Sequence, residues 1–151
     1  MDNTITIPNI QEYTQQIIDT NLVLTRITPV IDEATPVIDY ATLFQKNLRG
    51  SIVEECTINN TIKDNKKYMQ ILRDLYSTTD IETILQNTIL NISQQVIYDR
   101  GFKYYTNLGI SIQYADARRT LKEIINIIQI KNYSMELKIK LSNDEVIRFI
   151  I

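Results

Sequence analysis

Apolar residues recur at every seventh position through roughly the first quarter of the chain. The series is Ile10, Ile17, Leu24, Ile31 and Ile38. An apolar heptad is typical of a helical face that packs against another helix. That second helix can belong to the same chain or to another subunit, and the spacing leaves both alternatives open.

A repeated pentapeptide interrupts this series. Thr-Pro-Val-Ile-Asp occurs twice, beginning at Thr28 and at Thr35. Its prolines cannot lie inside one continuous helix, because an interior proline costs about 3 kcal/mol. We therefore expect one helix over about 9–26 and a second that begins at Pro36 and ends before Gly50, a glycine in the usual C-terminal position.

The middle of the chain also has helical spacing. A helix is predicted over 64–76, and a longer one over 79–100, where Thr79 and Glu82 have the spacing of a capping box and Gly101 follows the end. Apolar positions of the longer helix are Ile81, Ile84, Leu85, Ile92 and Val96. The segment 52–64 stays unassigned, because its Asn and Thr residues weaken a helix.

The last third of the chain alternates between strand and helix patterns. Strands are predicted over 102–106, 110–114, 135–141 and 146–151, and a helix over 116–131. A three-residue loop over 143–145 would place Leu141 opposite Ile147 and Ile139 opposite Phe149, so that apolar side chains share one face.

These patterns predict an α+β fold in a single domain, 1–151. We expect a predominantly helical N-terminal half, over about 8–100, and a C-terminal part over about 101–151 with a small antiparallel β-sheet and one helix. No change in composition and no Pro/Gly/Ser-rich linker marks a second domain.

Composition narrows the functional classes. The net charge is −2, which excludes a strongly basic nucleic-acid-binding protein but allows a local basic patch. The single cysteine, Cys56, favours a reducing compartment. We expect no signal peptide and no membrane span, hence a cytoplasmic or virion location. Many residues have AT-rich codons, which suggests a source with an AT-rich genome, such as some bacteria and their viruses.

Candidate catalytic chemistry is sparse. The chain has no histidine, and its three glycines are far apart, so we expect no cofactor held by a Rossmann or P-loop motif. Cys56 lacks a histidine base and is predicted to be a small buried residue. Carboxylate pairs remain as an alternative: Glu136, two residues before Lys138, together with Asp116 could form the site of a metal-dependent hydrolase. The acidic residues Asp32, Glu33 and Asp39 match no calcium-loop spacing.

A second alternative is a nucleic-acid-binding accessory protein. Its candidate patch is Arg100, Lys103, Arg118 and Arg119. Phe102, Tyr104 and Tyr105 lie between or beside these cations, and such mixtures bind single strands by stacking and phosphate contact.

The preferred hypothesis is a non-enzymatic structural or assembly protein, a component of a viral or phage particle or a similar oligomer. Its partners would be protein subunits, either copies of itself or others, held by helix packing and edge-strand pairing. The candidate interface residues are Ile10, Ile17, Leu24, Phe149, Ile150 and Ile151. The last three belong to an apolar final strand, which must be buried by the fold or pair with another chain.

Overall fold

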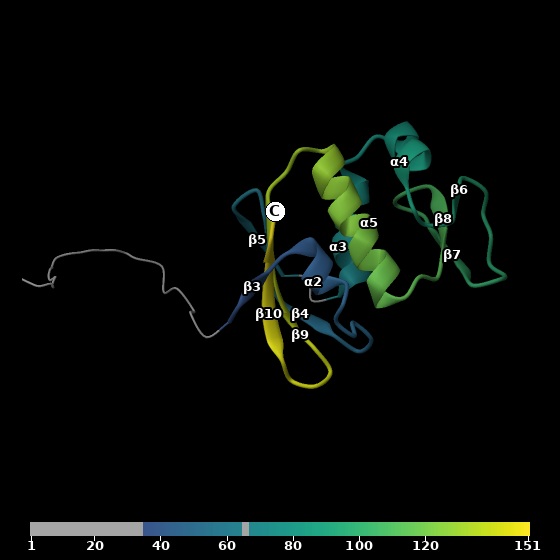
Figure 1. Ribbon diagram of the computed structural model, residues 1–151. Coiled ribbons are helices and arrows are strands. Elements are labelled where there is room, and N and C mark those ends of the chain that lie inside the picture. Colours follow the sequence, from purple (N-terminus) through teal and green to yellow (C-terminus); the bar gives the residue numbers. More distant parts are fainter. Residues whose placement is uncertain (1–34, 65–66) are drawn as a thin grey trace, which may run out of the picture. The chain divides into compact units, whose positions relative to one another are not determined.

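The computed structural model describes residues 35–64 and 67–151 (Figure 1). The predicted helix over 9–26 and the candidate residues Ile10, Ile17 and Leu24 lie outside the described residues. The described part contains eight strands in two sheets and four helices.

The predicted fold class is therefore wrong. Strands outnumber helices in the described residues, and the helices are not concentrated in the N-terminal half. The fold is mixed α/β, and its largest sheet joins strands from both halves of the chain.

A five-stranded sheet forms one layer. Its order is β3-β10-β9-β4-β5, and only β3 runs parallel to its neighbour. The strands are β3 (Val37–Ile38), β4 (Ile52–Ile58), β5 (Thr61–Lys63), β9 (Met135–Lys140) and β10 (Val146–Ile150). Both edge strands are short, a common way to limit pairing with other chains.

Helices cover one face of this sheet. They include α2 (Tyr40–Leu43), α3 (Tyr68–Ser77) and α5 (Ala117–Ile130). The shared core consists of fully buried aliphatic side chains. From the sheet come Val53, Leu137, Ile139 and Ile147, and from the helices Leu72, Leu121, Ile124 and Ile128. Within the described residues, none of the helices has both the length and the apolar character that crossing a membrane requires.

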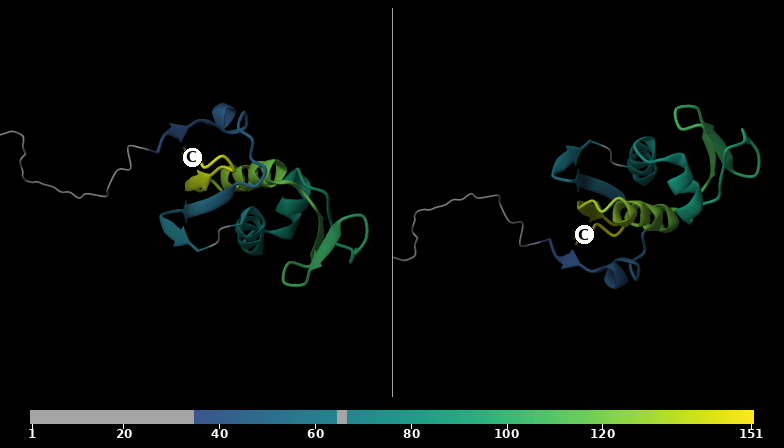
Figure 2. Two further views of the ribbon diagram at one scale, coloured as in Figure 1. Left: turned by 90° about the horizontal axis from the view of Figure 1, so that it is seen from below. Right: turned by 90° about the horizontal axis from the view of Figure 1, so that it is seen from above.

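A three-stranded antiparallel sheet lies beyond α3 and α5 (Figures 1 and 2). Its strands are β6 (Ile92–Ser93), β7 (Phe102–Tyr105) and β8 (Ile110–Gln113), in the order β6-β8-β7. The buried hydroxyl of Ser111 donates to the Gln95 carbonyl at 2.6 Å and accepts from the Ile97 amide at 3.0 Å. These bonds hold the loop between β6 and β7 against the sheet.

Two predicted helices are much shorter than expected. In the predicted helix over 36–49 only α2 forms, because Val37–Ile38 pairs with β10 instead. The helix predicted over 79–100 is α4 (Ile81–Asn87), since Thr88 has extended backbone angles and the chain then enters β6. Its N-cap is Asp80, not Thr79; the Asp80 carboxylate accepts from the Thr83 amide at 3.2 Å.

The unassigned segment 52–64 contains a β-hairpin. Asn59 and Asn60 form its two-residue loop, both with positive φ (49° and 63°), as type I′ turns require. The alternation of β4 is hidden in the sequence because a register shift at Glu54 separates Val53 from Cys56 and Ile58 on the buried face.

The elements predicted for the last third of the chain are confirmed, and their ends differ from the prediction by no more than about two residues. They are β7, β8, α5, β9 and β10. The register of β9 and β10 differs from the prediction by two residues. Ile139 lies opposite Ile147, and Leu137 opposite Phe149. The loop has three residues as expected, but it spans 142–144, because Leu141 pairs with Glu145 and Asp144 adopts a φ of 71°. A shift of two leaves every side chain on its predicted face.

Candidate functional site

We call the face of the five-stranded sheet opposite α3 and α5 the outer face. Cross-strand partners share a face, so the registers define its rows. One row runs Ile150, Glu136, Thr57, Ile62, and the next runs Val37, Arg148, Lys138, Glu55. A shorter third row runs Val146, Lys140, Ile52.

Apolar side chains lie at the flanks of these rows. Val37, Ile52, Ile62 and Ile150 are between 45% and 79% exposed. No helix of the described residues covers them, since α2, α3 and α5 occupy the other face (Figure 1). They stand on opposite flanks of the face, Val37 and Ile150 on one side and Ile52 and Ile62 on the other.

Ion pairs fill the centre of the outer face. Arg148 donates to one oxygen of Glu136 from Nε at 3.0 Å and from Nη2 at 2.8 Å. Lys138 Nζ lies 3.9 Å from a Glu55 oxygen. Such partly exposed pairs each contribute about 0–1 kcal/mol to stability, but they bring charges of both signs together between the apolar flanks.

The last strand, β10, lies inside the five-stranded sheet and not at its edge. β10 lies between β3 and β9, and β3 pairs with it at Arg148 and Phe149, so this part of the strand offers no open edge to another chain. Phe149 is buried in the core and is not available to a partner, whereas Ile150 is exposed on the outer face. Ile151 is partly exposed, and its backbone exchanges two hydrogen bonds with Met135, at 2.9 Å and 3.1 Å.

The four candidate nucleic-acid residues come from two segments, 100–103 and 118–119, and make different contacts. Arg118 donates to the Phe44 carbonyl, and Arg119 Nη2 donates to the Ile89 carbonyl at 2.7 Å. Both arginines thus tie loops to the start of α5. Arg100 is exposed with its Nε 3.5 Å from Asp99, and Lys103 Nζ lies 5.5 Å from the ring centre of Tyr105. Nucleic-acid binding by these residues stays a prediction.

The candidate hydrolase carboxylates lie apart. Glu136 is on the outer face, while Asp116 caps α5, on the opposite side of the sheet, by accepting from the Arg119 amide at 2.9 Å. Hydrogen bonds from Thr42 cap α2 at Asp39 and lower the pKa of that carboxyl. Asp32 and Glu33 lie outside the described residues, and among the described ones no three His, Cys, Asp or Glu side chains converge as metal ligands do.

Cys56 is buried, as predicted. Its side chain faces the core from β4, with about 1% of the residue exposed. Burial raises the pKa of the thiol to about 11. Since the thiolate is the nucleophile, a thiol in this environment is unreactive at neutral pH.

A buried polar group was missed by sequence reasoning. Glu123 on α5 is fully buried and accepts from the Tyr76 hydroxyl, the Ile89 amide at 3.1 Å and the Asn126 side chain at 3.0 Å. Asn126 also donates to the Asn87 carbonyl at 2.8 Å. The group holds the end of α4 against α5. A signal was present, because Glu123 has helical spacing with the apolar Ile127.

Comparisons with known proteins give no match: no family model, curated protein or solved structure is significantly similar to this chain. The functional conclusion therefore depends on the geometry described above.

Proposed function

We propose that this protein is a non-enzymatic structural protein that assembles with other protein subunits through the outer face. The observation that carries the proposal is the set of four exposed apolar side chains, Val37, Ile52, Ile62 and Ile150, at the flanks of a partly neutralised sheet face. Composition suggests a viral or phage particle as the setting.

A second copy of the chain is the partner that fits the charges best. In a two-fold interface the same patch meets itself, so a face of one charge would repel its copy. The outer face instead mixes Glu55 and Glu136 with Lys138 and Arg148. Burying its apolar flanks against another sheet supplies the driving force, at roughly 25 cal/mol per Å² of apolar surface.

The test is the mass of the full chain in solution, measured by light scattering over a concentration series. We expect the average mass to rise from monomer to dimer with concentration. Ile52→Lys and Ile62→Lys place a charge at the interface, and each is expected to weaken association at least about tenfold.

Val96→Lys is the matched control, because Val96 is as exposed as Ile52 (54% and 52%) but lies on the loop between β6 and β7. It should leave association unchanged. A wild-type chain that stays monomeric at every concentration, or an Ile62→Lys variant that associates as the wild type does, would contradict the proposal.

A further inference from the structure

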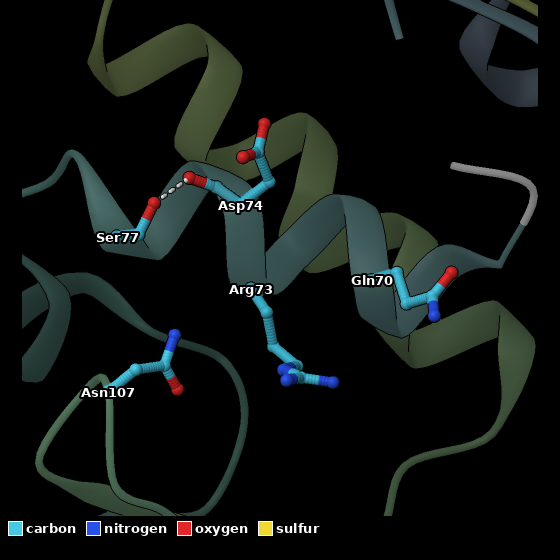
Figure 3. Close-up of a pocket in the computed structure, with 5 residues that line it drawn as sticks. All are labelled: Gln70, Arg73, Asp74, Ser77 and Asn107. Atoms are coloured by element: carbon cyan, nitrogen blue, oxygen red, sulfur yellow. Dashed lines mark hydrogen bonds between the residues drawn. The ribbon is translucent and has the colours of Figure 1, made fainter. Parts of the chain in front are cut away.

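A pocket of about 300 Å³ lies between α3 and the turn that joins β7 to β8. Its lining residues are Gln70, Arg73, Asp74, Ser77 and Asn107 (Figure 3). Four of them come from α3 and one from the turn. In Figure 3 the side chains of Arg73 and Asn107 extend from these two elements into the space between them.

Among the described residues, the Arg73 guanidinium has an aromatic contact but no hydrogen-bond acceptor. Its Cζ lies 4.6 Å from the ring centre of Tyr105. Its Nε is buried and has no hydrogen-bond partner, and among the described residues no carboxylate is paired with this side chain. Stacking occupies the flat face of a guanidinium and leaves the N–H groups at its edge free to bind a ligand.

Few buried polar atoms in folded proteins lack a partner. Within the described residues, Arg73 Nε is the one buried side-chain nitrogen or oxygen without a hydrogen-bond partner. Because Nε is itself closed off from solvent, a ligand in the pocket would have to bind through the terminal Nη1 and Nη2 groups of Arg73, which are not among the buried unpaired atoms.

The other lining residues are compatible with an anion. The Asp74 carboxylate points away from Arg73 (Figure 3) and lies 3.5 Å from Lys63 Nζ. Ser77 donates its hydroxyl proton to the Asp74 carbonyl at 2.6 Å, so this proton is not directed at the pocket. The amides of Gln70 and Asn107 line the pocket with donors that can turn toward it.

We propose that this pocket binds a phosphate group, as inorganic phosphate or a small phosphate ester. Arg73 would donate to two phosphate oxygens from Nη1 and Nη2, and Gln70 and Asn107 would donate to the others. Donors from more than one direction suit a tetrahedral phosphate better than the two oxygens of a carboxylate. Lys103, whose Nζ is 5.5 Å from the same Tyr105 ring, adds positive potential nearby. The site does not depend on the assembly function, because it shares no residue with the outer face.

Calorimetric titration of the full chain with inorganic phosphate tests the proposal, with acetate titrated in parallel. We expect saturable one-to-one binding of phosphate, and weaker binding of acetate. Arg73→Gln should lower phosphate affinity at least tenfold, and Arg73→Lys should lower it severalfold, since lysine keeps the charge but loses the planar fork. Asn107→Asp, a substitution on an exposed turn that leaves α3 intact, should lower it at least tenfold through charge repulsion.

Arg100→Gln is the control, because it removes the same charge from the other end of β7 and should change affinity less than twofold. Far-UV circular dichroism of each variant establishes that it is folded. The proposal is overturned if phosphate does not bind saturably to the wild type, if acetate binds more tightly than phosphate, or if folded Arg73→Gln and Asn107→Asp both bind as the wild type does.

Discussion

At the scale of residues, the polar groups buried between α4 and α5 hold these helices in place. Tyr76 donates to Glu123, and its oxygen lies 3.3 Å from the Thr88 hydroxyl. Burial raises the pKa of Tyr76 well above its usual value, and the neighbouring Glu123 carboxyl raises it further. Tyr76 therefore stays protonated and acts as a donor throughout the physiological pH range.

Replacing Tyr76 by Phe should lower the free energy of unfolding by about 1–3 kcal/mol, because a buried Glu123 oxygen loses its donor. Urea denaturation measures the change. Tyr98→Phe removes the same hydroxyl from a highly exposed side chain and should change stability by less than about 0.5 kcal/mol. Equal effects of the two variants would show that the buried hydrogen bonds do not stabilise the protein.

Residue chemistry was only partly accessible from the sequence. The burial of Cys56 followed from the absence of a histidine partner. The free guanidinium edge of Arg73 did not, because Tyr105 and Asn107 reach it only through the pairing of β7 with β8 and its packing beside α3. In the same way, no spacing rule indicates that Arg118 and Arg119 bind loop carbonyls on different segments.

At the scale of elements, regular patterns were predicted well and interrupted ones were not. The strict alternation of β9 and the capped apolar face of α5 each identify one element. In β4 a bulge breaks the alternation, so the alternation rule does not identify this strand, which lies next to the central β9. The helix over 79–100 was extended too far because Ile92, which belongs to β6, also fits helical spacing.

The turn between β9 and β10 gives a test at this scale. Asp144 has a φ of 71°, which favours glycine and is costly for a β-branched residue. Asp144→Gly should keep or raise stability, by up to about 1 kcal/mol, and Asp144→Val should lower it by about 1–2 kcal/mol. Thermal unfolding of both variants measures this.

Asp99→Val is the control, because Asp99 is exposed and does not have a positive φ; its stability should change by less than about 0.5 kcal/mol. If Asp144→Val proves as stable as the wild type, the observed turn and the register it sets are wrong.

At the scale of the whole described molecule, α3 and α5 separate two sheets of different character. The three-stranded sheet is held by the buried Ser111 and its loop, and the Arg73 pocket opens beside it. The five-stranded sheet buries one face against the helices and leaves apolar side chains exposed on the other. The alternation over 135–141 predicts that one side of β9 faces solvent, as it does on the outer face. Ile52 and Ile62, in contrast, come from the segment 52–64, to which the hydrophobic pattern assigns no element.

The most direct test of assembly through the outer face is methyl NMR of the full chain, labelled at isoleucine δ1 positions and recorded over a concentration series. Ile52, Ile62 and Ile150 lie on the outer face, while the exposed Ile89 and Ile130 lie elsewhere. We predict that the methyl signals of the first three shift or broaden with concentration and that those of Ile89 and Ile130 do not. Signals from the outer face that stay constant at every concentration, or changes confined to Ile89 and Ile130, would contradict the account.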